Sequence, residues 1–180
     1  RLIRDRRADR DPGASFVQVN AAEAAALGAH VESLIGAHAP TTVVDAYAGS
    51  GDMAVALASR GIAVTAIELD AEASAWCAQR LAAPSRAVAA RVEDALAGAL
   101  PADVVLLNPP RAGVAPAVTD LLAAADPPPQ AIVYVSCDPA TLARDVARLP
   151  GWKVASLVCF DMFPQTSHVE TVCELVPEAA

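Results

Sequence analysis

Residues 43–51 read VVDAYAGSG, a short apolar run that passes through a carboxylate into a glycine-rich turn. The run is typical of a buried strand, and glycines let the chain turn sharply and bring backbone N–H groups close to a ligand. The turn is not a phosphate-binding G-x-x-x-x-G-K-[ST] loop, because it has no lysine, and Ala54 breaks the G-x-G-x-x-G pattern. The stretch therefore predicts a strand, a turn and a helix in that order.

The rest of the chain alternates between strand-like and helix-like patterns. Alternation of this kind predicts βαβ units and a mainly parallel sheet with helices on both faces. The end differs, because 152–161 and 168–176 both read as strands and predict a C-terminal β-hairpin. Earlier strands are expected at 42–46, 62–68, 87–92, 103–107 and 131–136, and helices at 21–37, 51–59, 71–82, 115–125 and 139–148.

The composition fits one folded domain. The 180 residues are 54% hydrophobic, which excludes a disordered chain. No apolar run approaches the roughly 20 residues of a membrane helix and no signal peptide opens the sequence, so we expect a cytoplasmic protein. The four cysteines form no C-x-x-C pair, and we therefore expect no metal site in this chain.

The charge is unevenly distributed. A net charge of −8 argues against a surface that grips phosphates, because nucleic-acid affinity comes largely from Lys and Arg. Residues 1–10 nevertheless hold five arginines, and the sequence starts at Arg1 instead of Met. We expect residues 1–15 to form an arginine-rich segment, either a solvated tail or an RNA-binding arm, and the chain to be part of a longer protein.

Acidic residues follow the second and third predicted strands. Glu68 ends the second strand about twenty residues after the turn, where a carboxylate can accept hydrogen bonds from the ribose hydroxyls of an adenosine-bearing cofactor. Asp94 comes just past the third strand, in a position to meet the adenine. The alternatives are an exposed strand-end carboxylate for Glu68 and a helix N-cap for Asp94.

Cys137 directly follows the strand predicted at 131–136. Ligands of open α/β sheets bind beyond the carboxyl ends of the strands, so a thiol there would face bound substrate. Cys137 is therefore a candidate nucleophile, and a small buried hydrophobe is the alternative. We expect Cys77, Cys159 and Cys173 to be core residues.

The strand-end residues together resemble the S-adenosylmethionine site of the Rossmann-like methyltransferases. The resemblance rests on Asp45, the glycine turn, Glu68 and Asp94, and it covers nearly the whole chain. It implies a seven-stranded sheet whose last two strands form a hairpin with one antiparallel member. It also implies S-adenosylmethionine as cofactor, bound by Asp45, Tyr47, Gly49, Gly51, Glu68, Asp94 and Asn108, together with Gln18, which contacts the cofactor or the target base.

Four motifs, in order, resemble the uracil-C5 RNA methyltransferases, which make 5-methyluridine in tRNA or ribosomal RNA. The resemblance implies that Cys137 is the nucleophile, that Glu170 is the general base, and that Asn108, Pro109 and Arg111 contact the base to be methylated. Arg111 either pairs with a phosphate or braces its loop. The motifs are Phe16-x-Gln18-x-Asn20, Pro109-Pro110-Arg111-x-Gly113, the segment from Tyr134 to Asp145, and the segment from Asp161 to Glu170.

The chemistry explains why a thiol and a carboxylate are needed together. Uracil C5 is too weak a nucleophile to attack a sulfonium methyl unaided, so a thiolate first adds to C6 and makes C5 electron-rich. After methyl transfer, a base must remove the C5 proton so that the thiolate can leave. A carboxylate such as Glu170, in a partly apolar hairpin, is expected to have a raised pKa that suits this task.

Two residues depart from the family pattern. Asn108 stands where Asp is usual, and an amide both donates and accepts where a carboxylate only accepts. Asp138 follows Cys137 where Asn is usual, and its charge would raise the pKa of the thiol unless it caps the next helix, which we expect.

Residues 16–180 are thus expected to form a uracil-C5 methyltransferase domain whose RNA substrate is gripped largely by an N-terminal domain outside this chain. Two alternatives stay open. One is a methyltransferase for another planar substrate, with Cys137 incidental. The other is a non-catalytic RNA-binding or cofactor-binding domain that retains the fold.

Overall fold

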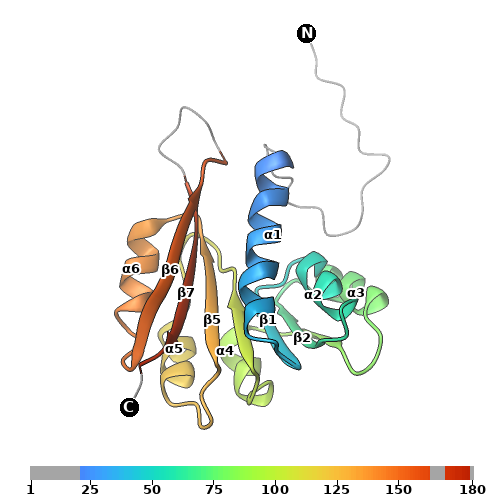
Figure 1. Ribbon diagram of the computed structural model, residues 1–180. Helices are drawn as coiled ribbons and strands as arrows, with labels where there is room; N and C mark the ends of the chain where they lie inside the picture. Colours follow the sequence, from blue (N-terminus) through green and yellow to red (C-terminus); the bar gives the residue numbers. More distant parts are fainter. Residues whose placement is uncertain (1–20, 163–168, 179–180) are drawn as a thin grey trace.

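The computed structural model describes residues 21–162 and 169–178 (Figure 1). Gln18 and residues 163–168 of the fourth motif lie outside the described residues. None of the helices in the described ranges is both long and apolar enough to cross a bilayer. The helices are α1 (Ala21–Ala37), α2 (Asp52–Ala58), α3 (Ala71–Arg80), α4 (Val92–Ala95), α5 (Pro116–Ala123) and α6 (Pro139–Val146). The strands are β1 (Thr42–Ala46), β2 (Ala63–Glu68), β3 (Arg86–Ala89), β4 (Val104–Leu107), β5 (Ala131–Ser136), β6 (Trp152–Phe160) and β7 (Glu170–Pro177).

The strands of the described residues form one seven-stranded sheet in the order β3-β2-β1-β4-β5-β7-β6. Strands β1 to β5 pair in parallel, whereas β7 is antiparallel to both of its neighbours, β5 and β6. The chain builds outward from β1 toward β3 and then returns to place β4 on the other side of β1. The predicted α/β fold and its C-terminal hairpin are confirmed, and the sheet is mixed because of β7.

Helices cover the two faces of the sheet in separate groups. Helix α1, blue in Figure 1, packs with α2 and α3 on one face, where Val31, Ile35 and Leu57 are at most 1% exposed. Helices α4, α5 and α6 pack on the opposite face, where Val118 and Leu122 are fully buried. Burying each such side chain contributes about 1.5–3 kcal/mol, so both faces stabilise the sheet that carries the site.

Two local predictions were wrong. The strand expected at 87–92 ends at Ala89, and the chain then forms the short helix α4, which the sequence analysis did not predict. Val92 and Leu96, four residues apart, both point into the core, and this packing favours a helical turn. Cys159 is exposed because β6 is the edge strand with a single neighbour, whereas Cys77 and Cys173 are buried as expected.

The glycine turn after β1 gives a prediction for stability. Gly51 has φ +83°, and a Cβ there would lie 2.1 Å from Sγ of the buried Cys77. We expect Gly51→Ala to lower the free energy of unfolding by about 2–4 kcal/mol, from backbone strain plus overpacking. Gly61 is the matched control, because it has φ +85° and no atom within 4 Å of its Cβ position. Urea denaturation of both variants should show the smaller loss for Gly61→Ala; equal losses would contradict the packing argument.

Candidate active site

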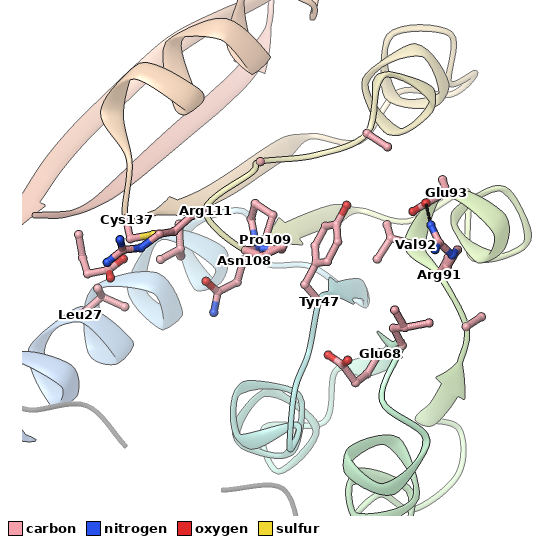
Figure 2. Close-up of a pocket in the computed structure, with 17 residues that line it drawn as sticks. Leu27, Tyr47, Glu68, Arg91, Val92, Glu93, Asn108, Pro109, Arg111 and Cys137 are labelled. Carbon is pink, nitrogen blue, oxygen red and sulfur yellow. Dashed lines mark hydrogen bonds and ion pairs between the residues drawn. The ribbon is translucent and has the colours of Figure 1, made fainter. Parts of the chain in front are cut away.

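A cavity of about 900 Å³ opens at the edge of the sheet where the parallel strands end (Figure 2). Tyr47 follows β1, Glu68 ends β2, Asn108 follows β4 and Cys137 follows β5. Carboxyl ends of parallel strands meet at one edge, so residues distant in sequence converge there. The cavity is lined by Leu27, Tyr47, Glu68, Leu69, Ala90, Arg91, Val92, Glu93, Asn108, Pro109, Pro110, Arg111, Gly113, Ala115, Val135, Cys137 and Glu170.

The antiparallel direction of β7 brings Glu170 to the same edge. Because β7 runs opposite to β5, its first residue lies where β5 ends. The strand register pairs Ser136 with Thr171, so Cys137 and Glu170 follow as the next opposed positions. Opposed residues of an antiparallel pair share a face, which places the thiol and the carboxylate together in the cavity.

Figure 2 shows that the cavity has two ends. Cys137 and Arg111 lie at one end, near Leu27 of α1, and Glu68 and Val92 lie at the other. Asn108, Pro109 and Tyr47 lie between them. The predicted nucleophile, the predicted substrate contacts and the predicted cofactor contact Glu68 thus face one continuous space.

The carboxylate of Glu68 is held by the backbone. Its Oε2 accepts from the N–H of Gly49 at 2.8 Å, and its Oε1 accepts from the N–H of Asp70 at 2.8 Å. Each oxygen retains a second lone pair, and the side chain lines the cavity. The glycine turn therefore orients an acceptor pair toward the space where a ligand would bind.

Asp45 lies behind the turn and is only 2% exposed. Its pKa is raised to about 7, mainly by burial and to a smaller extent by the negative charge of Glu68, while a backbone hydrogen bond from Ala54 opposes the shift. Among the described residues its Oδ2 is a buried atom without a hydrogen-bond partner. The residues that line the cavity do not include Asp45, Gly49 or Gly51.

The segment after β3 places Glu93, rather than Asp94, on the cavity. Glu93 lines the space and its Oε1 accepts from Nη1 of Arg91 at 3.0 Å, whereas Asp94 is exposed and is not among the lining residues. Arg91, Val92 and Glu93 were not predicted as site residues, because the strand was expected to continue to residue 92. Because β3 ends at Ala89, the residues that face the cavity come earlier in the chain than predicted.

Leu69 and Leu27 were also missed. Leu69 follows the strand-end carboxylate and is 63% exposed, and a large apolar residue in that exposed position could have indicated a ring-binding surface. Leu27 belongs to α1 and lines the end that holds Cys137. No signal in the alanine-rich sequence of α1 distinguishes it, because only packing places that turn over the cavity.

The loop after Cys137 is fixed by its neighbours. Oγ of Ser136 accepts from the N–H of Asp138 at 3.1 Å and donates to the carbonyl of Asp138 at 3.0 Å. The carboxylate of Asp138 accepts from the N–H groups of Ala140 and Thr141, which confirms the predicted cap of α6. The charge of Asp138 is therefore engaged by the helix N-terminus.

Glu170 is 8% exposed, and this burial raises its pKa, while the positive charge of Arg111 opposes the rise. The carboxyl group is thus a stronger base than a solvated glutamate. Tyr47 also lines the cavity, and burial, together with the charge of Glu93, raises its pKa to about 12. Tyr47 therefore stays neutral at physiological pH and offers a phenol to the space between the two ends.

The sequence model of the tRNA (Uracil-5-)-methyltransferase family matches residues 81–176, more than half of the chain. This chain belongs to that family.

Two relatives of the family are similar over nearly the whole domain. The 23S rRNA (uracil(747)-C(5))-methyltransferase RlmC of Shewanella amazonensis is 35% identical over an aligned length of 175 residues, and the match covers 92% of this chain and 44% of the relative. The crystal structure of the tRNA (uracil-54, C5)-methyltransferase of Pyrococcus abyssi, in complex with S-adenosyl-L-homocysteine, superposes with a TM-score of 0.78. It is 32% identical and the match covers 91% of this chain and 40% of that protein. The chain thus spans less than half the length of these family members.

More distant structures share the fold alone. The N-methyltransferase NodS of Bradyrhizobium japonicum superposes with a TM-score of 0.70 at 13% identity, and the match covers 88% of this chain and 99% of NodS. The fold of this family member is therefore the Rossmann-like methyltransferase fold that the sequence resembles.

Proposed function

We propose that this chain is the catalytic domain of an enzyme that methylates C5 of a uridine in RNA, with S-adenosylmethionine as methyl donor. The observation that carries the proposal is that Cys137 and Glu170 lie opposite each other where β5 ends and β7 begins, and that both line the cavity. Glu68 lines the other end of the same cavity. Ribosomal RNA and tRNA, the substrates named for the two relatives, are the substrate classes that we infer. We infer that the enzyme works in the cytoplasm.

The residues present fit the cofactor. Glu68 offers carboxylate oxygens for ribose hydroxyls, and Leu69 and Val92 offer apolar surface for an adenine ring. When bound, S-adenosylmethionine supplies an electrophilic methyl group.

The proposed reaction gives Cys137 and Glu170 different roles. The thiolate of Cys137 adds to C6 of uracil, which moves electron density to C5 and allows the methyl to be taken up there. Glu170 then removes the C5 proton, the C5–C6 double bond re-forms, and the Cys137 sulfur leaves with the electrons of its C6 bond. Asn108, between the two ends, has an amide that can accept from N3–H of uracil and donate to O4.

The proposal is tested with the full-length parent protein, because the chain spans 44% of the RlmC relative. Ribosomal RNA and tRNA transcripts are incubated with S-adenosylmethionine carrying a labelled methyl group, and the RNA is digested to nucleosides. We expect label in 5-methyluridine. Label in a different nucleoside would support a methyltransferase for another planar substrate, and cofactor binding without any transfer would support a non-catalytic domain.

Cofactor binding gives a prediction for Glu68. In Glu68→Gln the amide must direct an NH2 group at one of the two backbone N–H donors, which disrupts the orientation of the side chain. We expect the Kd for S-adenosylhomocysteine to rise about 10- to 100-fold, as for loss of hydrogen bonds to a charged group. Isothermal titration calorimetry measures it, with the exposed Glu72→Gln on α3 as control. An unchanged affinity in a folded variant would exclude Glu68 from the cofactor site.

A further inference from the structure

The loop at residues 108–114, which carries the predicted substrate contacts, is attached to α6 through its main chain. Oγ1 of Thr141 donates to the carbonyl of Arg111 at 3.3 Å. Nη2 of Arg144 donates to the carbonyl of Ala112 at 2.8 Å. Because these bonds use backbone groups, the side chain of Arg111 stays on the cavity.

Asp145 is the centre of this attachment and is fully buried. Its Oδ2 accepts from the N–H of Val114 at 3.0 Å and from the hydroxyl of Tyr134 at 2.8 Å. Its Oδ1 faces Arg144 and Arg148, at 2.8 and 3.5 Å. One carboxylate therefore joins the substrate loop, the strand β5 that leads to the nucleophile, and the helix α6 that follows it.

The loop is shaped for this contact. Gly113 has φ +78°, and a Cβ there would lie 2.2 Å from Oδ2 of Asp145 and 2.4 Å from Cγ2 of Thr141. Only a residue without a side chain allows the backbone to approach the buried carboxylate this closely. The close approach to Asp145 thus explains the glycine of the Pro-Pro-Arg-x-Gly motif.

Asp145 is a buried carboxylate paired with two partly exposed arginines, and such ion pairs are a weak source of stability, since apolar residues of similar volume often serve as well. Its position suggests another role, because the carboxylate lies between the loop with Arg111 and the strand that ends beside Cys137. We propose that Asp145 is a positioning residue that holds the substrate-facing loop at a fixed distance from the nucleophile. The catalytic part of this inference rests on the proposed function, whereas the attachment of the loop can be tested without it.

The test is Asp145→Asn in the full-length protein. The amide keeps the size of the side chain but must direct its NH2 group either at the arginines or at the N–H of Val114. We expect hydrogen–deuterium exchange at residues 108–114 to accelerate about tenfold. We expect kcat for RNA methylation to fall about 10- to 100-fold, because small displacements of reacting groups are costly. The Kd for S-adenosylhomocysteine should stay within about twofold, because Glu68 lies at the other end of the cavity. The control is Asp120→Asn, an exposed residue of α5.

Each outcome decides the inference. A folded Asp145→Asn protein with unchanged exchange in the loop, or with faster exchange and unchanged kcat, would overturn it. If this variant does not fold, Arg144→Gln repeats the test at a side chain that is 44% exposed, with the same expected exchange and kcat changes. If the wild-type protein methylates no uridine, the proposed function fails. Hydrogen–deuterium exchange at residues 108–114 then decides alone whether Asp145 holds the loop.

Discussion

Cys137→Ala should abolish methylation while leaving cofactor binding intact. Without the sulfur, C5 of uracil is not activated, so we expect methyl transfer by the full-length protein to fall by about 10⁴-fold or more, as when other enzymes lose their nucleophile. The Kd for S-adenosylhomocysteine should change little, because Cys137 lies at the end of the cavity opposite Glu68. Single-turnover transfer to RNA and calorimetry with S-adenosylhomocysteine measure the two quantities.

A substrate analogue that traps the covalent intermediate tests the role of Cys137 directly. RNA that carries 5-fluorouridine has no C5 proton to lose after methylation, so elimination is blocked and the wild-type protein should accumulate a covalent adduct that mass spectrometry assigns to Cys137. Cys159→Ala is the matched control, because Cys159 is exposed on β6 and does not line the cavity. An adduct in Cys137→Ala, or its absence in both Cys159→Ala and an active wild type, would contradict the assignment.

Glu170→Gln should separate methyl transfer from product release. The amide cannot take the C5 proton, so the methylated adduct should accumulate with ordinary uridine RNA while turnover falls by roughly 10²- to 10⁴-fold. Denaturing gel electrophoresis of labelled RNA detects the adduct, and Glu178→Gln, at an exposed site of the described chain, is the control. Slow turnover without adduct would mean that Glu170 acts before or during methyl transfer, contrary to its proposed role as the base.

The pH dependence of adduct decay follows from the environment of Glu170. Burial raises its pKa, so the basic form is lost at a higher pH than for a solvated glutamate, and decay should slow as the pH falls through that raised value. The charge of Arg111 lowers the same pKa. Arg111→Gln should therefore shift the acidic limb of the decay profile to higher pH, whatever its effect on RNA affinity. A limb that stays in place would show that Arg111 and Glu170 are not coupled.

Most of the fold could be predicted because its signals are local. The apolar runs 42–46 and 131–136 are strands with the predicted bounds, since β-branched residues between turn residues favour buried parallel strands. Asp138 was expected to cap α6 and does so, because an N-cap depends only on the next few residues. Helix α4 was not predicted, because Val92 and Leu96 indicate a helix only when a core exists on one side of them.

The site divides in the same way. The sequence by itself determined the residue types at the strand ends, among them Glu68, Asn108 and Cys137, because position relative to a strand is a local property. The tertiary structure decided that Glu170 faces Cys137, because that depends on the insertion of β7 between β5 and β6 and on its register. The raised pKa of Glu170 confirms a prediction from the sequence. The tertiary structure alone decided the burial of Asp145, since desolvation and contact are set by segments that approach one another only in the folded chain.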